Sequence, residues 1–240
     1  MTSVTEAAPP AAGPGRQDRL ERYDRFVDHI RKLCREDAGP RAALRSGLRR
    51  PVTQSPRMHA FVAPWAPSNN EAVERAYYAI AAMIAAQARD ARDTNLNAAT
   101  AGNAAHAVGT PVTPVPAETP PGEEAAHRPS LGETLGRAVS AKLLKDDTTE
   151  KRLHLVVRQG VDGVHRQLPG LVQHLRSEGV PVDWGQLLFD LAQWERFRDR
   201  VAKRWLQDYY RAVYTRRNDT SDAPVGGTDP GSATTPSTGK

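Results

Sequence analysis

The sequence is poor in the residues that cross-link a chain or anchor it in a membrane. It contains one cysteine, Cys34, among 240 residues, which excludes an internal disulfide framework and a thiolate metal cluster. No apolar run reaches the ~18 residues that a membrane-spanning helix requires. The N-terminus also lacks a basic region followed by an apolar one. We therefore expect a soluble protein of a reducing, cytoplasmic compartment.

Apolar side chains are scarce for a chain of this length. Hydrophobic residues make up 39% of the sequence, and the mean hydropathy is -0.59. Such a composition cannot bury enough surface along its whole length to offset the entropy lost on ordering. We expect disorder at 1–15, in an Ala/Thr/Pro-rich insertion at 88–129 and in a tail at 215–240. An N-terminal helical part then spans 16–87, and a C-terminal helical part spans 130–214.

Strand signals are also missing. No segment alternates apolar and polar residues with a period of two, and no Asn-Gly or Asp-Gly pair stands between β-branched runs. Apolar residues recur instead at spacings of three and four, which is typical of amphipathic helices. The sequence therefore predicts an all-α fold, a helical bundle of about eight or nine helices. Three of these helices have clear N-caps, namely Asn70, Ser130 and Asp183.

Some local structure between the helices can also be predicted. Four prolines in the segment 51–70 indicate an extended connector with Phe61 and Trp65 as anchors. Glu133 would complete a capping box with Ser130. The apolar stripe of that helix is predicted to end in the core at Leu143. A polar turn is expected at 146–147, and the Ala-rich segment 71–87 reads as a buried helix.

Residue patterns that would indicate catalysis are few. The chain has no Gly-rich phosphate loop. His154, His165 and His174 lack the i, i+4 spacing with an intervening glutamate of a zinc helix, so we expect each to be partly exposed or hydrogen-bonded. Cys34 lies on a predicted core stripe, and the acids are scattered. We expect no enzyme activity, no catalytic residue, no metal site and no cofactor.

Arginine is abundant, and its first cluster lies at 38–57, where there are five basic residues and no acid. Arg41, Arg45 and Arg49 follow one another at i, i+4 and i+8. In a continuous helix this spacing places three guanidinium groups along one stripe. Like charges at i, i+4 repel one another by about a few tenths of a kcal/mol unless an anion neutralises them. The pattern therefore favours binding of an anion.

The second cluster lies at 194–217, with eight basic and three acidic residues. Two helices are predicted here, the first from Trp184 to about Gln193 and the second from Trp194 onward. Three tryptophans in these helices are expected in the core: Trp184, Trp194 and Trp205. On the second helix Phe197, Val201, Trp205 and Tyr209 share one side, with the basic residues opposite. A surface helix with a solvated charged face is the alternative interpretation.

The positive charge of the chain is concentrated in these two clusters. Each has a net charge of +5, whereas the whole chain also has +5 and a pI near 9.5. Arginine outnumbers lysine, which suits bidentate contacts to phosphate. No base-reading motif is present, so we expect sequence-independent contact with nucleic-acid backbones. The candidate binding residues are Arg41, Arg45, Arg49, Arg50, Arg137, Lys142, Arg196, Arg200, Lys203, Arg204 and Arg211.

Six blocks of the sequence resemble the CasB family, the small subunit of the type I-E CRISPR surveillance complex, Cascade. The resemblance covers roughly residues 20–214 apart from the insertion, which is longer than the family's usual linker. The blocks are GPRAALRSGLRRP, APWAP, RAYYAIAAMIAAQ, SLGETLGRAV, LPGLVQHLRSEGVPVDWGQLLFDLAQW and RWLQDYYRA.

The resemblance implies an all-helical, non-catalytic subunit that forms a homodimer within Cascade. It implies contacts with the backbone and large subunits, and with the guide RNA and target DNA of the R-loop. Alternatively, the basic faces contact only acidic patches of the other subunits. The matching blocks carry over Arg41, Arg45, Arg49, Arg137, Arg200, Lys203 and Arg204.

Overall fold

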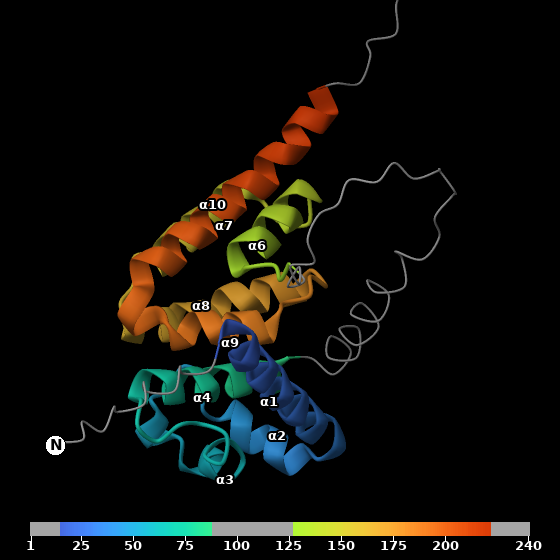
Figure 1. The fold of residues 1–240 in the computed structure, drawn as a ribbon. Helices are drawn as coiled ribbons and strands as arrows, with labels where there is room; N and C mark the ends of the chain where they lie inside the picture. The colour runs from blue at the N-terminus through green and yellow to red at the C-terminus, as the bar shows by residue number, and fades with distance from the viewer. Residues whose placement is uncertain (1–14, 88–126, 222–240) are drawn as a thin grey trace, which may run out of the picture.

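The computed structural model describes residues 15–87 and 127–221 (Figure 1). Within these two ranges there are nine α-helices, two short 3-10 helices and no strand, which confirms the all-α prediction. Most of the residues predicted to be disordered lie outside the described ranges, so that expectation stays a prediction. Among the described residues, no helix combines the length and apolar character needed to cross a membrane.

The N-terminal part is built on two long helices. α1 (Arg16–Glu36) and α4 (Glu71–Ala86) pack against each other, and α2 (Ala38–Arg45) packs on both. Asn70 caps α4 as predicted, because its side chain accepts a hydrogen bond from the Val73 N–H at 3.0 Å. The alanines of α4 are mostly buried, which lets its neighbours approach closely. The short elements between α2 and α4 are η1 (Val52–Gln54), η2 (Pro56–Met58) and α3 (His59–Val62).

The C-terminal part contains the remaining five helices: α6 (Leu131–Ser140), α7 (Asp146–Val157), α8 (Val161–Ser177), α9 (Trp184–Ala192) and α10 (Trp194–Ser221). α6 lies directly against α10 at two glycines. A Cβ added at Gly132 would lie 1.8 Å from the Trp205 carbonyl oxygen, and one at Gly136 would lie 2.5 Å from that of Tyr209. Only glycine permits this approach of the two backbones.

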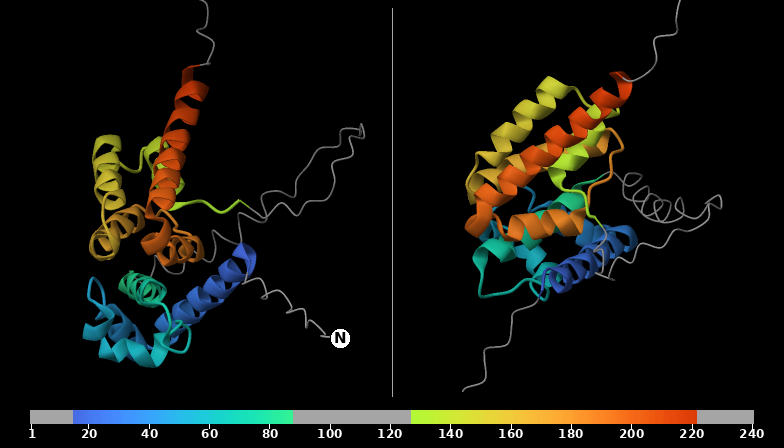
Figure 2. Two further views of the ribbon diagram at one scale, coloured as in Figure 1. Left: turned by 60° about the vertical axis from the view of Figure 1, so that its left-hand side comes forward. Right: turned by 45° about the horizontal axis from the view of Figure 1, so that its top comes forward.

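α9 joins the two parts of the molecule. It packs against α1 and α4 on one side and against α10 on the other, as the two views of Figure 2 also show. The predicted core tryptophans are all buried: Trp184, Trp194 and Trp205 are at most 1% exposed. The rings of Trp194 and Trp205 lie 5.1 Å apart. One core cluster therefore spans both parts.

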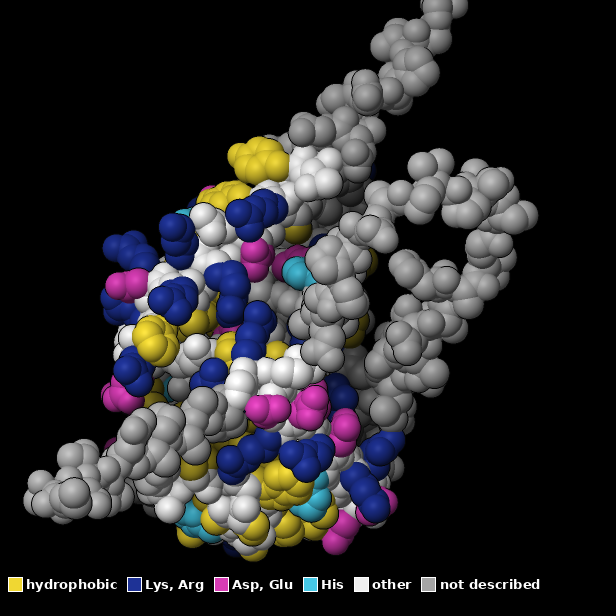
Figure 3. All heavy atoms as spheres, viewed as in Figure 1, with side chains coloured by type: hydrophobic (Ala, Val, Ile, Leu, Met, Phe, Trp, Pro, Cys, Tyr) yellow, Lys and Arg dark blue, Asp and Glu magenta, His cyan; other side chains and the backbone are white. Residues whose placement is uncertain are grey.

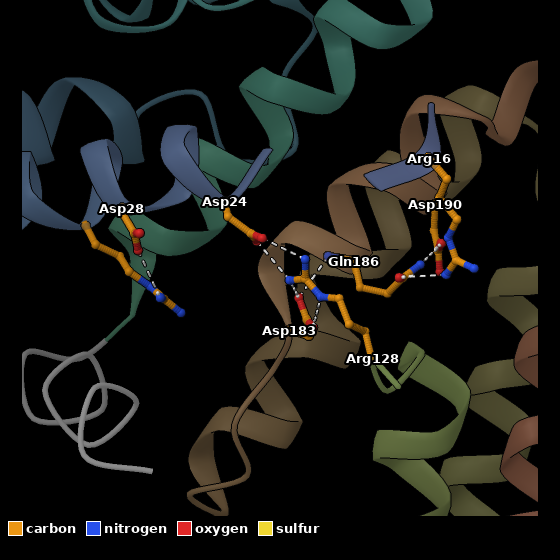
Figure 4. A network of polar contacts seen from close by, with 8 residues as sticks. Arg16, Asp24, Asp28, Arg128, Asp183, Gln186 and Asp190 are labelled. Atoms are coloured by element: carbon orange, nitrogen blue, oxygen red, sulfur yellow. Dashed lines mark hydrogen bonds and ion pairs between the residues drawn. The ribbon is translucent and has the colours of Figure 1, made fainter. Parts of the chain in front are cut away.

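Arg128 fixes the chain between α1 and α9, as Figure 4 shows. Its guanidinium donates to Asp24 at 2.7 Å and to Asp183 at 2.5 Å, and Asp183 also caps α9 by accepting from the Gln186 N–H at 2.8 Å. Burial lowers the pKa of Arg128, but the hydrogen bonds that it donates to the two carboxylates outweigh burial and raise the pKa overall. The residue therefore stays charged while it links the two parts.

Three local predictions about helix ends were wrong. α6 ends at Ser140, so Leu143 is 48% exposed and the buried position belongs to Leu144. Asp146 and Asp147 form the first turn of α7 rather than a turn before it, where negative charge favours a helix N-terminus. α10 continues to Ser221, past the predicted end near 215, because no Pro or Gly interrupts the sequence there.

Three further local predictions also need correction. The connector 51–70 forms short helical turns, which Pro51 and Pro56 tolerate at their starts; Phe61 and Trp65 do pack on the core. Ser130 accepts from the Glu133 N–H at 3.2 Å, but the Glu133 carboxylate pairs with Arg137 instead of closing a capping box. His165 is 7% exposed, and neither of its ring nitrogens has a hydrogen-bond partner among the described residues.

Candidate nucleic-acid interface

The basic face of α10 is the largest group of candidate residues. Val201, Trp205 and Tyr209 are buried on one side of this helix. The basic residues on the other side are exposed, apart from Arg204, which is half-buried: Arg196, Arg200, Lys203 and Arg211. Lys and Arg side chains gather over the lower part of α10 in Figure 3, with hydrophobic side chains toward its upper end. The amphipathic pattern predicted for this helix is therefore present in the structure.

Arg204 has a partner inside the protein. Its guanidinium pairs with the fully buried carboxylate of Asp190 on α9. The same carboxylate accepts hydrogen bonds from Trp205 Nε1 at 2.6 Å and from Gln186 Nε2 at 2.6 Å. Burial raises the pKa of Asp190, and the positive charge of Arg204 opposes that shift. Arg204 thus stabilises the packing of α9 against α10.

Two more basic residues of α10 lie beside acids at the surface. Arg211 contacts Asp208 at 3.5 Å, and Arg198 contacts Asp199 at 3.2 Å. Within the described residues, Arg196, Arg200 and Lys203 have no carboxylate partner. We call these three residues the open row. They supply three positive charges that no described carboxylate neutralises, and an external anion can neutralise them.

The arginines near α2 are arranged differently from the predicted stripe. α2 ends at Arg45, and Arg49 lies in the following turn with a left-handed φ of 62°. The three residues therefore do not share one helix face, and that prediction was wrong. Arg41 donates to the Gln87 carbonyl at 3.1 Å and to the Ala85 carbonyl at 3.4 Å, so it caps the end of α4.

We call the segment 38–57 the α2 region. Its other candidate arginines are exposed: Arg45, Arg49 and Arg50. None of them has an ion pair in the described part of the chain. Arg45 borders a groove of about 280 Å³ between α4 and α8. This α2 region lies at the opposite end of the molecule from α10 in Figures 1 and 2. The structure does not join the two clusters into one continuous surface.

The two candidates on α6 and after it are both exposed. Arg137 pairs with Glu133 one turn earlier on the same helix. Lys142 lies in the turn after α6 with a left-handed φ of 60°, and no described acid pairs with it. The predicted outward orientation of both residues is confirmed.

Sequence reasoning missed a ring that belongs to the α10 surface. Phe197 was assigned to the buried side, but it is only half-buried. The guanidinium carbons of Arg196 and Arg200 each lie 5.2 Å from its ring centroid. The alternation of Arg196, Phe197 and Arg198 in the sequence was the available signal. An aromatic residue among arginines is typical of surfaces that bind unpaired nucleic acid.

The described residues contain no group of three or more His, Cys, Asp or Glu side chains positioned to hold a metal ion. The histidines have other surroundings. His154 lies 3.0 Å from the Tyr210 hydroxyl, and His174 is partly exposed, both as predicted.

Residues 40–210 match the family model of the CRISPR-associated protein Cse2. The chain belongs to the Cse2 family. The matched range begins within α2 and ends within α10, so it contains all five basic residues of the first cluster and five of the eight of the second, up to Arg204. The resemblance to the CasB family is thereby confirmed.

Solved structures agree with the Cse2 assignment. One chain of a "CRISPR RNA-guided surveillance complex" has 40% sequence identity and a TM-score of 0.66, and the match covers 84% of this chain and 99% of that one. A chain of such a complex described as "pre-nicking" has 41% identity and a TM-score of 0.66, over 84% and 98% of the two chains. CasB from M. ruber shares the fold at 19% identity, with a TM-score of 0.60 over 85% and 99%. No curated protein sequence matches the chain.

Proposed function

We propose that this Cse2-family protein is a non-catalytic small subunit of a type I-E Cascade complex, in which it binds nucleic acid and stabilises the R-loop. Its partners are then the backbone and large subunits, the guide RNA, the target DNA and a second copy of the chain. The matched chains from surveillance complexes support this assignment, because each is covered almost completely. A cytoplasmic location fits these partners.

The open row on α10 is the observation that carries the proposal. Arg196, Arg200 and Lys203 lie on one exposed helix face without carboxylate partners in the described residues. When such side chains neutralise phosphates, condensed counterions are released into solution, and this release favours binding at low salt. The contacts reach only the backbone, so the protein accepts any sequence. An R-loop requires this property, because its sequence is set by the guide.

The α2 region and the α6 end supply further candidates. Arg45, Arg49 and Arg50 are exposed and unpaired within the described residues, and Lys142 is likewise exposed. Arg41, Arg137, Arg204 and Arg211 remain candidates but have contacts inside the chain. We therefore rank the four exposed residues without an internal partner among the described residues after the open row, and the four with internal contacts below them.

A second function is that the basic faces bind acidic patches of other subunits. Surface arginines of this chain do pair with carboxylates, as Arg137 does with Glu133 and Arg211 with Asp208. In that case removal of the open row weakens assembly of the complex rather than its hold on nucleic acid.

Reconstituted complexes distinguish the two functions. A triple alanine variant at Arg196, Arg200 and Lys203 is expected to assemble normally, as judged by size-exclusion chromatography, but to open target DNA less stably in permanganate footprinting. The matched control replaces three exposed basic residues of α1: Arg25, Lys32 and Arg35. If the open-row variant fails to assemble, or opens DNA as well as the control does, our assignment is wrong.

A further inference from the structure

Phe197 lies where α10 breaks. Its backbone, with φ -132° and ψ 32°, is not helical, although the helix continues on both sides of it. The break turns the first residues of α10 around a shallow hollow of about 460 Å³, which includes Gly160 and Val161 at the start of α8. The half-buried Phe197 ring borders this hollow. A flat aromatic surface is thus placed at the edge of a basic helix face.

The two arginines beside the ring belong to the open row. The guanidinium carbons of Arg196 and Arg200 each lie 5.2 Å from the Phe197 centroid. Within the described residues, each guanidinium contacts only this ring. Cation–ring contacts at an exposed site are weak, so a ligand can replace or extend them.

A second phenylalanine that contacts two arginines has a purely structural role and serves for comparison. Phe189 on α9 has the guanidinium carbons of Arg16 and Arg19 at 5.5 and 5.4 Å, but this ring is 5% exposed. Arg16 also donates to Gln186 at 3.4 Å. That cluster covers a core residue. The cluster at Phe197 instead borders an open hollow, and its two guanidinium groups have no polar contact with the described residues.

We propose that Phe197, Arg196 and Arg200 hold one unpaired base of a single-stranded nucleic acid. The base stacks on the ring or on a guanidinium plane, and the remaining guanidinium N–H groups donate to the flanking phosphates. Paired bases stack on one another inside a duplex, so only an unpaired strand offers a free base face. The inference rests on the proposed nucleic-acid function and adds to it the class of ligand and the residue that selects it.

The test compares Phe197→Leu with Phe197→Tyr in the full chain, by fluorescence anisotropy on labelled oligothymidylate, on an abasic oligomer of equal length and on a duplex. Leucine fills the site without an aromatic face, whereas tyrosine keeps one, and neither changes the charge. We expect Phe197→Leu to bind oligothymidylate at least fivefold more weakly, since stacking contributes about a five- to hundredfold gain per base. Phe197→Tyr should match the wild type, and duplex binding should not change.

The abasic oligomer makes the test independent of how well the variants fold. The wild type should bind this oligomer at least fivefold more weakly than oligothymidylate, with an equal dependence on salt. Equal affinity of the wild type for both oligomers overturns the stacking site. Unchanged DNA binding by Phe197→Leu, with loss of complex assembly, also overturns it and indicates a protein segment at this site. If the wild type binds no nucleic acid at low salt, it is the proposed function itself that fails.

Discussion

The α2 region and α10 both present arginines at helical spacing in the sequence, but the structure uses them differently. α2 has eight residues and ends at Arg45, whereas α10 spans 28 residues. In each region one arginine is turned inward, Arg41 to backbone carbonyls of α4 and Arg204 to the buried Asp190 of α9, whereas Arg198 and Arg211 of α10 pair only with acids at the surface of the same helix. The comparison teaches that charge spacing predicts a shared face only where the helix continues.

The reason for the difference lies in what each helix packs against. Gly47 follows α2, and a Cβ there would lie 2.0 Å from the Met58 sulfur. A larger residue at position 47 would displace the Met58 side chain, whereas glycine fits there and, as a poor helix former, favours the end of α2. From Val201 to Val213, α10 instead has a buried residue at every fourth position, so packing stabilises it over several turns.

Loss of the inward arginine of α10 should have the largest effect. In Arg204→Ala the buried Asp190 carboxylate loses its charged partner, and we expect the free energy of unfolding to fall by about 2–3 kcal/mol. This is near the low end of the usual range, because the Arg204 side chain is 35% exposed. Arg200→Ala, which removes an open-row charge, should change the value by less than ~0.5 kcal/mol. Urea denaturation of both variants measures these two changes in unfolding free energy. Equal decreases for the two variants would show that the inward and the open arginines do not differ in their effect on stability.

The free energy of unfolding should depend on pH through a buried histidine that lies beside the α2 region and not on α10. His165 on α8 lies beneath the turn that holds Arg49 and Arg50, and desolvation, then the nearby Arg75, lower its pKa to about 4, against a smaller opposing effect of Asp162. The unfolded chain takes up this proton near pH 6.5, before the folded chain does. The stability that depends on neutral His165 is therefore fully present above about pH 6.5. It is lost as the pH falls toward 4.

The size of this loss is at most about 3 kcal/mol, at 1.36 kcal/mol for each pH unit between the two pKa values. His165→Leu removes the titrating group, so the difference in unfolding free energy between wild type and variant should change across this window. Urea denaturation at pH 7, 5.5 and 4 measures the difference. Parallel pH profiles would show that His165 does not limit acid stability.

The inward arginine of the α2 region should matter less than that of α10. Arg41→Ala removes two hydrogen bonds to the end of α4, and one of them is long at 3.4 Å. We expect a loss of about 1 kcal/mol, whereas the exposed Arg45→Ala should lose less than ~0.5 kcal/mol. Thermal unfolding of the two variants compares them. A loss as large for Arg45 as for Arg41 would show that the capping contact is not the source of the effect.

Features with local signals were predictable from the sequence. Asn70 and Asp183 cap their helices because a short polar side chain precedes an apolar periodic run. The tryptophans of α9 and α10 are buried because they fall on the apolar stripe. Of the candidate interface, the exposure of most α10 cations could be predicted for the same reason.

Features that depend on contacts between distant segments were not predictable. Arg128 reaches Asp24 across 104 positions, and Arg204 reaches Asp190 on another helix. No spacing rule relates such residues. The exposure of Phe197 depends on a backbone break that helical periodicity does not anticipate. The close contact between Gly47 and the Met58 side chain also had no local signal.

The salt dependence of binding to oligothymidylate tests the central claim most directly. Each phosphate contact contributes ~0.7 to the slope of log affinity against log salt for a single strand. Removal of Arg196, Arg200 and Lys203 together should therefore reduce the steepness of that slope by about 2. The α1 control triple, Arg25, Lys32 and Arg35, should leave the slope close to that of the wild type. Equal slopes for the open-row variant and the wild type would contradict the account, because the open row would then touch no phosphate.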